Sequence, residues 1–136
     1  MVASRSGPPR FERSLPLDVS ALPGARRQLQ AFLDGLDVER DVIDVVLLCV
    51  QEACKNAVCH SGSGESIDVS ITLDDDAVYA VVRDYGGGFD HARLPHRPPH
   101  PLSASGRGLF LIRALMDQVE IHGSSGTEVR MCKILA

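Results

Sequence analysis

Two polar side chains interrupt an apolar, helix-forming segment in the middle of the chain. Glu52 and Asn56 are four residues apart, so a helix places them on the same face, one turn from each other. The carboxamide oxygen of Asn56 suits Mg²⁺, which takes oxygen ligands and often shares them with phosphates and water. The carboxylate of Glu52 could accept the proton of an attacking hydroxyl. An ordinary solvated helix face has the same pattern, so this pair alone leaves both interpretations open.

A glycine-rich segment follows the second strand of a predicted hairpin. It reads RDYGGGF and begins at Arg83. A turn that needs positive φ angles would explain its glycines. In a binding site, Asp84 at the strand end could instead accept a hydrogen bond from an exocyclic amine. Gly86 and Gly88 would then let the backbone approach a flat ring closely.

A third motif opens a later helix with Gly106, Arg107 and Gly108. Backbone N–H groups and the helix dipole at such a start can bind an anion, although turn geometry also explains the glycines. The motif is not a dinucleotide-binding fingerprint, because no strand precedes it and Leu111 occupies the place of the third glycine. The chain also lacks the GxxxxGK[ST] pattern of a P-loop. Lys55 could also contact phosphate, but it fits a solvated helix face as well.

The elements that must position these residues follow from apolar periodicity and from capping residues. Ser20 and Asp37 are the expected N-caps of the first two helices. The periodicity predicts helices at about 20–36, 38–60 and 108–117, and strands at 11–19, 67–73, 77–83, 119–122 and 127–135. This order predicts an α+β two-layer sandwich, in which helices cover one face of a mostly antiparallel sheet. Residues 90–105 are a long loop with four prolines and three histidines, His91, His96 and His100.

Length and composition place narrow limits on the organisation of the chain. Its 136 residues, 44% hydrophobic and 24% charged, predict a polar tail over residues 1–10 and a single domain over 11–136. A net charge of -4 argues against direct nucleic acid binding. No apolar run is long enough to cross a membrane, and no secretory signal is evident, so a cytoplasmic protein is expected. The cysteines form no CxxC pair and are expected to be buried, reduced thiols.

The order of these motifs resembles the nucleotide-binding (Bergerat) fold of the GHKL ATPase superfamily over about residues 12–135. Within that superfamily the chain is most similar to the stand-alone anti-sigma factor serine kinases of bacteria. The segments that look like the N box, the two glycine boxes and the terminal Gly-Thr element are QEACKNAVCHS, VRDYGGGFD, SGRGLFLIRALMDQVEI and GTEVRMCK.

The resemblance implies ATP (or ADP) and Mg²⁺ as cofactors and gives each matching residue a role. Glu52 is the implied catalytic base, Asn56 the metal ligand, and Asp84 the partner of the adenine amino group. Residues 89–105 are the implied lid, and Gly126 completes the adenine pocket from the last hairpin. The nucleotide-binding positions are Asn56, Asp84, Gly86, Gly88, Gly106, Arg107, Gly108, Leu109 and Thr127.

The same resemblance implies an anti-sigma factor that regulates transcription, for example in a stress response. Such a protein sequesters a sigma factor and phosphorylates a serine or threonine of a STAS-domain anti-anti-sigma factor, and it forms a homodimer. Two alternatives stay open. The chain could be a non-catalytic ATP-binding regulatory module, or a histidine-kinase-like catalytic domain that acts with a separate phosphoacceptor chain. The short stretch of about 35 residues before the long helix disfavours the latter.

Overall fold

The computed structural model describes residues 9–60, 66–85, 107–123 and 126–135. Their order of helices and strands matches the order expected from the sequence. In chain order they are β1 (Arg10–Pro16), a short 3-10 helix η1 (Val19–Ala21), α1 (Leu22–Asp34), α2 (Arg40–His60), β2 (Ser66–Leu73), β3 (Ala77–Asp84), α3 (Arg107–Leu115), β4 (Gln118–His122) and β5 (Glu128–Ile134).

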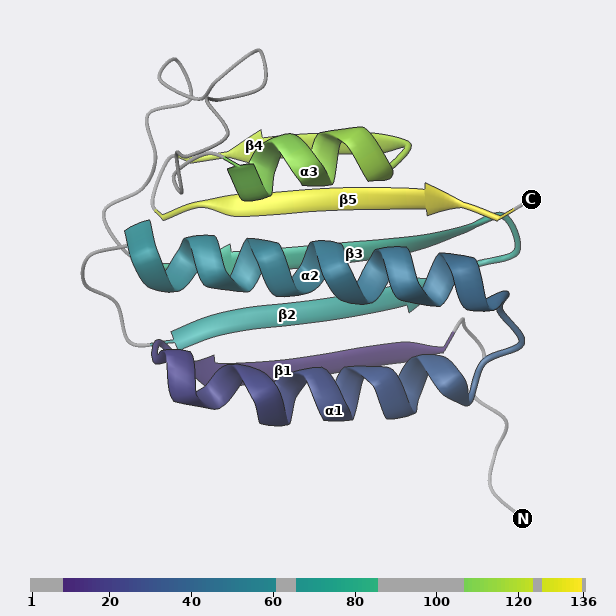
Figure 1. Ribbon diagram of the computed structural model, residues 1–136, viewed down its shortest axis with the longest axis horizontal. Helices are drawn as coiled ribbons and strands as arrows, with labels where there is room; N and C mark the ends of the chain where they lie inside the picture. Colours follow the sequence, from purple (N-terminus) through teal and green to yellow (C-terminus); the bar gives the residue numbers. More distant parts are fainter. Residues whose placement is uncertain (1–8, 61–65, 86–106, 124–125, 136) are drawn as a thin grey trace.

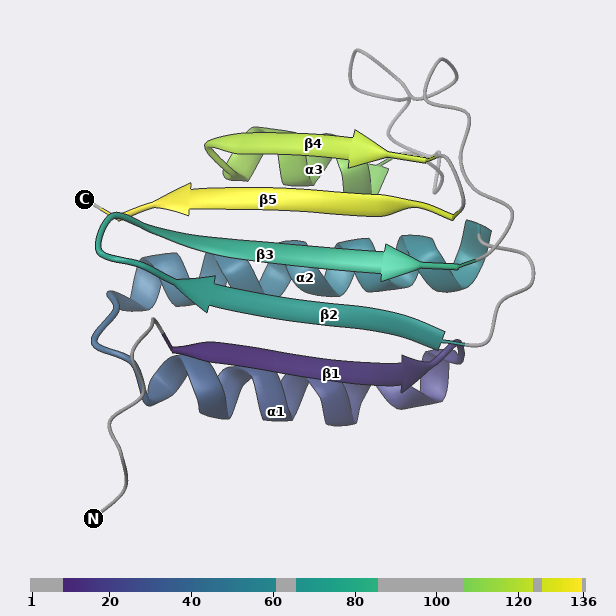
Figure 2. The ribbon, with the colours of Figure 1, turned by 180° about the vertical axis from the view of Figure 1, so that it is seen from behind.

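The five strands form one sheet in the order β1-β2-β3-β5-β4, and every neighbouring pair is antiparallel. Helices α1, α2 and α3 lie side by side on one face of this sheet (Figure 1). Figure 2 looks onto the opposite face, with the helices behind the strands. The predicted α+β two-layer sandwich is therefore confirmed. Strand β1 is an edge strand, as expected from Pro16, because a proline lacks the N–H group that an inner strand would donate.

Helix α2 lies in the middle of the helical layer and packs against α1, α3 and β3. Its apolar stripe faces the sheet: Ile43, Val46, Leu47, Val50, Ala53 and Ala57 are all buried. Val58, which follows Ala57, is only half-buried. Leu33 of α1 is fully buried. It points into the core because α1 lies between β1 and α2, so more of its surface is covered than a single stripe requires.

Several predicted boundaries differ from the structure. Ser20 does not cap α1. Asp18 caps the preceding η1, because Asp18 Oδ1 accepts a hydrogen bond from the Ser20 N–H at 3.0 Å, and the N-cap of α1 is Ala21, which makes no side-chain cap hydrogen bond. The helix itself begins at Leu22, since Pro23 fits the first turn, where no N–H donor is needed. Helix α2 begins at Arg40, two residues later than predicted. Strand β1 begins at Arg10, the last residue of the predicted tail.

The cysteines follow the prediction with one exception. All four are free thiols, and Cys49, Cys54 and Cys132 are buried. Cys59 is exposed, because it lies two residues after the buried Ala57 and so on the opposite side of the helix. None of the helices in the described part of the chain has an apolar stretch that could span a membrane.

Candidate functional site

The predicted site residues come from four elements that meet at one end of the sandwich, on the left in Figure 1. The carboxyl-terminal half of α2, the end of β3, the start of α3 and the start of β5 all reach this end. A cavity there is lined by four of the predicted residues, Asn56, Asp84, Leu109 and Thr127. Its remaining walls are apolar: Ala53, Ala57, Val82, Ile121 and Val129. Such a lining, apolar with a few polar groups, is typical of a small-molecule site.

Glu52 and Asn56 share one face of α2, as predicted, and the first turn of α3 lies against them. A Cβ atom placed on Gly108 would lie 3.0 Å from Glu52 Oε1 and 3.1 Å from Asn56 Nδ2. The absence of a side chain at Gly108 therefore lets the first turn of α3 approach the Glu52 and Asn56 side chains this closely. The start of α3, where backbone N–H groups can bind an anion, therefore lies directly beside these two side chains.

The carboxylate of Glu52 has a basic partner on its own helix. Lys55 Nζ lies 3.2 Å from Glu52 Oε2, and the Lys55 side chain is 53% exposed. The prediction of a solvated face holds for Lys55, but the sequence did not predict this ion pair. The i, i+3 spacing of the two residues was the available signal.

Asp84 and Thr127 are held together by two hydrogen bonds between β3 and the start of β5. The Thr127 N–H donates to Asp84 Oδ1 at 3.2 Å, and the Asp84 N–H donates to the Thr127 carbonyl at 2.9 Å. Both side chains are buried, at 3% and 4% exposure. A buried carboxylate is therefore fixed at the floor of the cavity, in an arrangement that can accept a hydrogen bond from a ligand.

Gly126 explains how the chain approaches Asp84 so closely. Its φ angle of 101° lies in the region that favours glycine, and a Cβ atom there would lie 2.2 Å from the Asp84 carbonyl oxygen. No other residue type fits this position without moving the backbone of β3. The glycine before Thr127 therefore has a packing reason that the sequence motif alone did not reveal.

Two buried polar atoms of the cavity have no hydrogen-bond partner among the described residues: Asn56 Nδ2 and Thr127 Oγ1. Leaving a buried donor or acceptor unpaired costs about 1–3 kcal/mol. Both residues line the same cavity, so a polar ligand there could satisfy both atoms. The donor set fits the predicted nucleotide, and the carboxamide of Asn56 also offers the oxygen that Mg²⁺ requires.

Some predicted positions cannot be compared with this geometry. Gly86, Gly88 and Gly106 lie outside the described residues, as does the expected lid at 89–105 with its three histidines. Arg107 is the first residue of α3. The sequence reasoning missed Val82, Ile121 and Val129 as lining residues, since apolar strand residues look alike until the sheet order is known.

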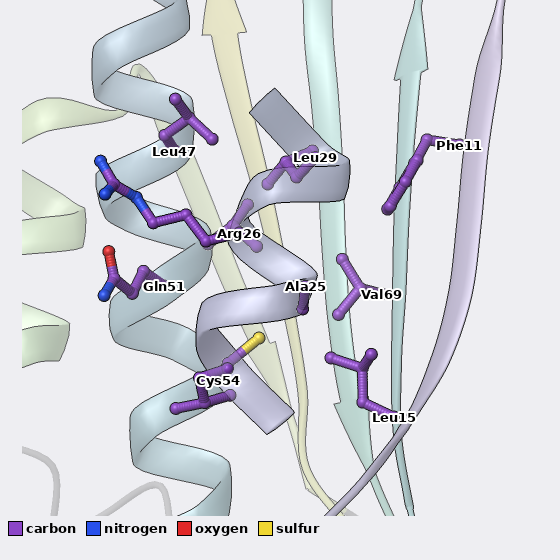
Figure 3. A pocket seen from close by; sticks show the side chains of 11 residues that line it. Phe11, Leu15, Ala25, Arg26, Leu29, Leu47, Gln51, Cys54 and Val69 are labelled. Carbon is purple, nitrogen blue, oxygen red and sulfur yellow. The ribbon is translucent and has the colours of Figure 1, made fainter. Parts of the chain in front are cut away.

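A second cavity lies between α1, α2 and the first two strands (Figure 3). Its wall is mostly apolar, and Arg26 extends from α1 toward α2 beside Gln51. Cys54 also faces it. None of the predicted site residues lines this cavity, so it is separate from the site at the end of the sandwich.

Comparison with known proteins adds named relatives. The family "Histidine kinase-like ATPase domain" matches residues 15–133. The serine-protein kinase RsbW of Bacillus subtilis is 35% identical, with 92% of this chain and 85% of the relative covered. The anti-sigma F factor of Bacillus velezensis is also 35% identical, with 93% and 95% covered.

Solved structures show the same fold. A structure of the RsbU and RsbW domains of a Mycobacterium tuberculosis protein has a TM-score of 0.72 at 23% identity, covering 93% of this chain and 32% of that one. The histidine kinase domain of a blue-light activated kinase from Erythrobacter litoralis has a TM-score of 0.59 at 17% identity, covering 98% of this chain and 66% of that one. The solved chains are thus longer than this chain.

These findings confirm the family and fold that the motif order predicted. The curated relatives span nearly the whole chain, and their names support the expected function of an ATP-binding anti-sigma factor of the serine kinase type. The chain belongs to the histidine kinase-like ATPase family.

Proposed function

We propose that this protein is an anti-sigma factor that transfers the γ-phosphoryl group of Mg-ATP to a serine or threonine of a STAS-domain anti-anti-sigma factor. The observation that carries the proposal is the meeting of two pairs at one end of the sandwich. Glu52 and Asn56 of α2 lie against Gly108, and Asp84 and Thr127 line the adjoining cavity. Glu52 and Asn56 suit the phosphate end of a nucleotide, and Asp84 and Thr127 suit its base.

The base would occupy the cavity between α2 and the sheet. The Asp84 carboxylate would accept a hydrogen bond from the adenine amino group, and the Thr127 hydroxyl would gain the partner that it lacks. Ala53 and Ala57 line this cavity from α2 with small apolar side chains, and Leu109 lines it from α3. Burial of the ring against these apolar side chains would supply much of the affinity.

The phosphates would lie where α3 begins. Free N–H groups in the first turn of a helix and its positive dipole end both favour an anion. Asn56, one turn beyond Glu52, would hold the Mg²⁺ ion through its side-chain oxygen. When bound, this ion would neutralise part of the charge on the transferring phosphoryl group.

Glu52 would act on the hydroxyl of the protein substrate. As the hydroxyl oxygen bonds to the γ-phosphorus, the bond from that phosphorus to the β,γ-bridging oxygen breaks and ADP leaves. The hydroxyl proton passes to the Glu52 carboxylate. The Glu52 side chain is only 19% exposed, which limits competition from water for this position.

The remaining parts of the proposal concern partners. An anti-sigma role implies a sigma factor as the sequestered partner, acting in the cytoplasm, and a second copy of this chain in a homodimer. The relatives that support it are named as serine-protein kinase RsbW and anti-sigma F factor.

The test is incubation with γ-labelled ATP, Mg²⁺ and candidate STAS-domain proteins, with Glu52→Ala as the inactive control. We expect an acid-stable label on a serine or threonine of one candidate. An acid-labile label on a histidine of a separate chain would favour the histidine-kinase alternative. Nucleotide binding without any transfer would favour the non-catalytic module. The absence of nucleotide binding would overturn the proposal.

A further inference from the structure

Asp84 and Thr127, the residues proposed to bind the adenine ring, have chain neighbours that meet on the opposite face of the sheet. Successive residues of a strand point to opposite faces, so Asp84 faces the helices while Arg83 and Tyr85 face away from them. In the β3–β5 pairing, Arg83 lies directly opposite Glu128. Glu128 immediately follows Thr127. The strand positions that carry Asp84 and Thr127 are therefore linked a second time, on the helix-free face shown in Figure 2.

The link is an ion pair with an additional partner. Arg83 Nη1 donates to Glu128 Oε1 at 3.1 Å, and Arg130 Nε donates to Glu128 Oε2. The Glu128 side chain is 13% exposed, less than most ion-pair partners on this protein's surface. Burial by itself would raise the pKa of Glu128, but the hydrogen bonds from Arg130 and Arg83 outweigh it and lower the pKa. Glu128 is thus a charged group at neutral pH and is held by two arginines.

Arg83 also connects to the neighbour on the other side of Asp84. Its guanidinium carbon lies 5.1 Å from the centroid of the Tyr85 ring, within the range of a cation–π contact. The Tyr85 hydroxyl in turn donates to Asp68 of β2. The residues before and after Asp84 are therefore both anchored, to β5 on one side and to β2 on the other.

The position of the Asp84 carboxylate matters for the choice of base. At the place where adenine carries an amino group that donates a hydrogen bond, guanine carries a carbonyl oxygen, which a carboxylate would repel. A site built to hydrogen-bond one group rejects an analogue that lacks it, provided that the protein group stays in place. If β3 and β5 moved relative to each other, the Asp84 carboxylate could turn away from the nucleotide base, or water could enter between them.

We propose that Arg83 and Glu128 are positioning residues that fix Asp84 and Thr127 across the sheet, and that they thereby set the preference of the site for adenine over guanine nucleotides. This inference rests on the proposed function of Asp84 as the partner of the base. Neither residue touches the cavity itself. They act through the two strands that they join.

The experiment measures the affinity for ATP and for GTP, each with Mg²⁺, by calorimetry. In Arg83→Gln and in Glu128→Gln we expect ATP to bind about tenfold more weakly, the loss of roughly one charge-assisted hydrogen bond. GTP affinity is expected to stay within about twofold, so the ATP/GTP preference falls by a similar factor. Arg83→Lys keeps the charge and should recover most of the preference.

The matched control is Glu12→Gln on the same face of the sheet. Glu12 also pairs with an arginine, Arg10, at 2.6 Å, but lies on the edge strand β1. It should leave both affinities unchanged. In a kinase assay, the Arg83 and Glu128 variants should raise KM for ATP while kcat at saturating ATP stays the same.

The possible outcomes distinguish a failure of the proposed function from a failure of the positioning role. If the unaltered protein binds neither nucleotide, the proposed function itself fails. If it prefers ATP and both Arg83→Gln and Glu128→Gln keep that preference, or lose affinity for both nucleotides equally, the positioning role is wrong. If Arg83→Gln does not fold, Glu128→Gln, which nearly preserves side-chain size, decides the question by the same ratio.

Discussion

Gly108 and Glu52 lie so close together that a single added carbon atom would bring them into contact. The first turn of α3 places the Gly108 Cα where a Cβ atom would lie 3.0 Å from Glu52 Oε1, and Asn56 Nδ2 lies only slightly farther away. Two helices far apart in the sequence thus meet at the predicted catalytic base through a glycine. The proposed phosphate site depends on this close approach, which places the start of α3 beside Glu52 and Asn56.

Gly108→Ala should therefore reduce phosphoryl transfer without unfolding the protein. Alanine favours a helix over glycine by about 0.5–1 kcal/mol, so α3 should persist. Its methyl group would push against Glu52 and Asn56, and we expect ATP to bind about tenfold more weakly, as when one hydrogen bond to a charged group is lost.

Gly24→Ala in α1 is the matched control, because the nearest atom to its Cβ would be the end of the Arg27 side chain at 3.7 Å. Calorimetry and thermal unfolding of both variants check the prediction. Equal ATP affinity in the two variants would contradict the assignment of this glycine to the site.

Gly126→Ala should destabilise the whole domain. The residue would adopt a φ angle of 101° with its Cβ atom 2.2 Å from the Asp84 carbonyl oxygen. Backbone strain at such an angle costs on the order of 1–3 kcal/mol, and the steric clash adds to it. Gly35→Ala, with only ordinary contacts near its Cβ, should change the free energy of unfolding little. Urea unfolding of the two variants checks this prediction. Similar unfolding midpoints would show that Gly126 does not pack tightly against the Asp84 carbonyl.

Asn56→Ala should weaken the binding of ATP in the presence of Mg²⁺. The side chain would supply the metal's protein ligand, so the difference in ATP affinity between Mg²⁺ and EDTA should largely vanish in the variant. Asp44→Ala, an exposed polar residue on the same helix, is the control. Calorimetric titration with and without Mg²⁺ measures the effect. An unchanged Mg²⁺ dependence would remove the metal role from Asn56.

Glu52→Ala should spare ATP binding and slow transfer. General-base catalysis contributes about 10²–10⁴-fold to a rate, so we expect a loss of at least a hundredfold at saturating ATP. The Lys55 ammonium, 3.2 Å from the carboxylate, would lose its partner, so Lys55→Ala serves as the control for the ion pair alone. The rate of single-turnover transfer to the STAS-domain substrate is measured for both variants. Equal rates with and without Glu52 would refute its role as base.

Stability should fall at high pH because of two buried thiols in α2. Burial raises the pKa of Cys54 to about 12 and, together with the nearby Glu52 charge, that of Cys49 to about 11. In the unfolded chain both thiols lose their protons near pH 9, whereas in the folded protein they keep them. The unfolded state therefore binds fewer protons above pH 9, and the free energy of unfolding decreases as the pH rises.

The expected slope is on the order of 1 kcal/mol per pH unit for each thiol between about pH 9 and the folded pKa. Urea unfolding from pH 8 to pH 11 measures it, and Cys54→Ala should make the slope shallower. A slope that is unchanged by this substitution would show that the Cys54 thiol does not contribute. The exposed Cys59 offers the comparison, because Cys59→Ala should leave the slope as it is.

Much of the fold could be read from apolar spacing. The alternation of Ile67, Val69 and Ile71 predicts a strand with one buried face, and all three are buried. The boundaries were harder, because Asp18 caps the short η1 that precedes α1, and α1 itself begins beside Pro23 without a side-chain cap that a motif could reveal.

The sequence by itself determined which residue types were available and in what order: a Glu-Asn pair on a helix, an aspartate at a strand end, and glycines before a helix and a strand. These follow from local rules, since helix and strand spacing fix which side chains share a face. The Glu52–Lys55 pair and the closeness of Gly108 were not predicted.

Only the tertiary structure decided which of these residues meet. The approach of Gly126 to Asp84, the cavity shared by Asn56 and Thr127, and the Arg83–Glu128 link all join residues that are distant in the chain. Their distances depend on the strand order and on the packing of α2 against the sheet. Those are set by how the whole core fills space, and no short stretch of sequence contains that information.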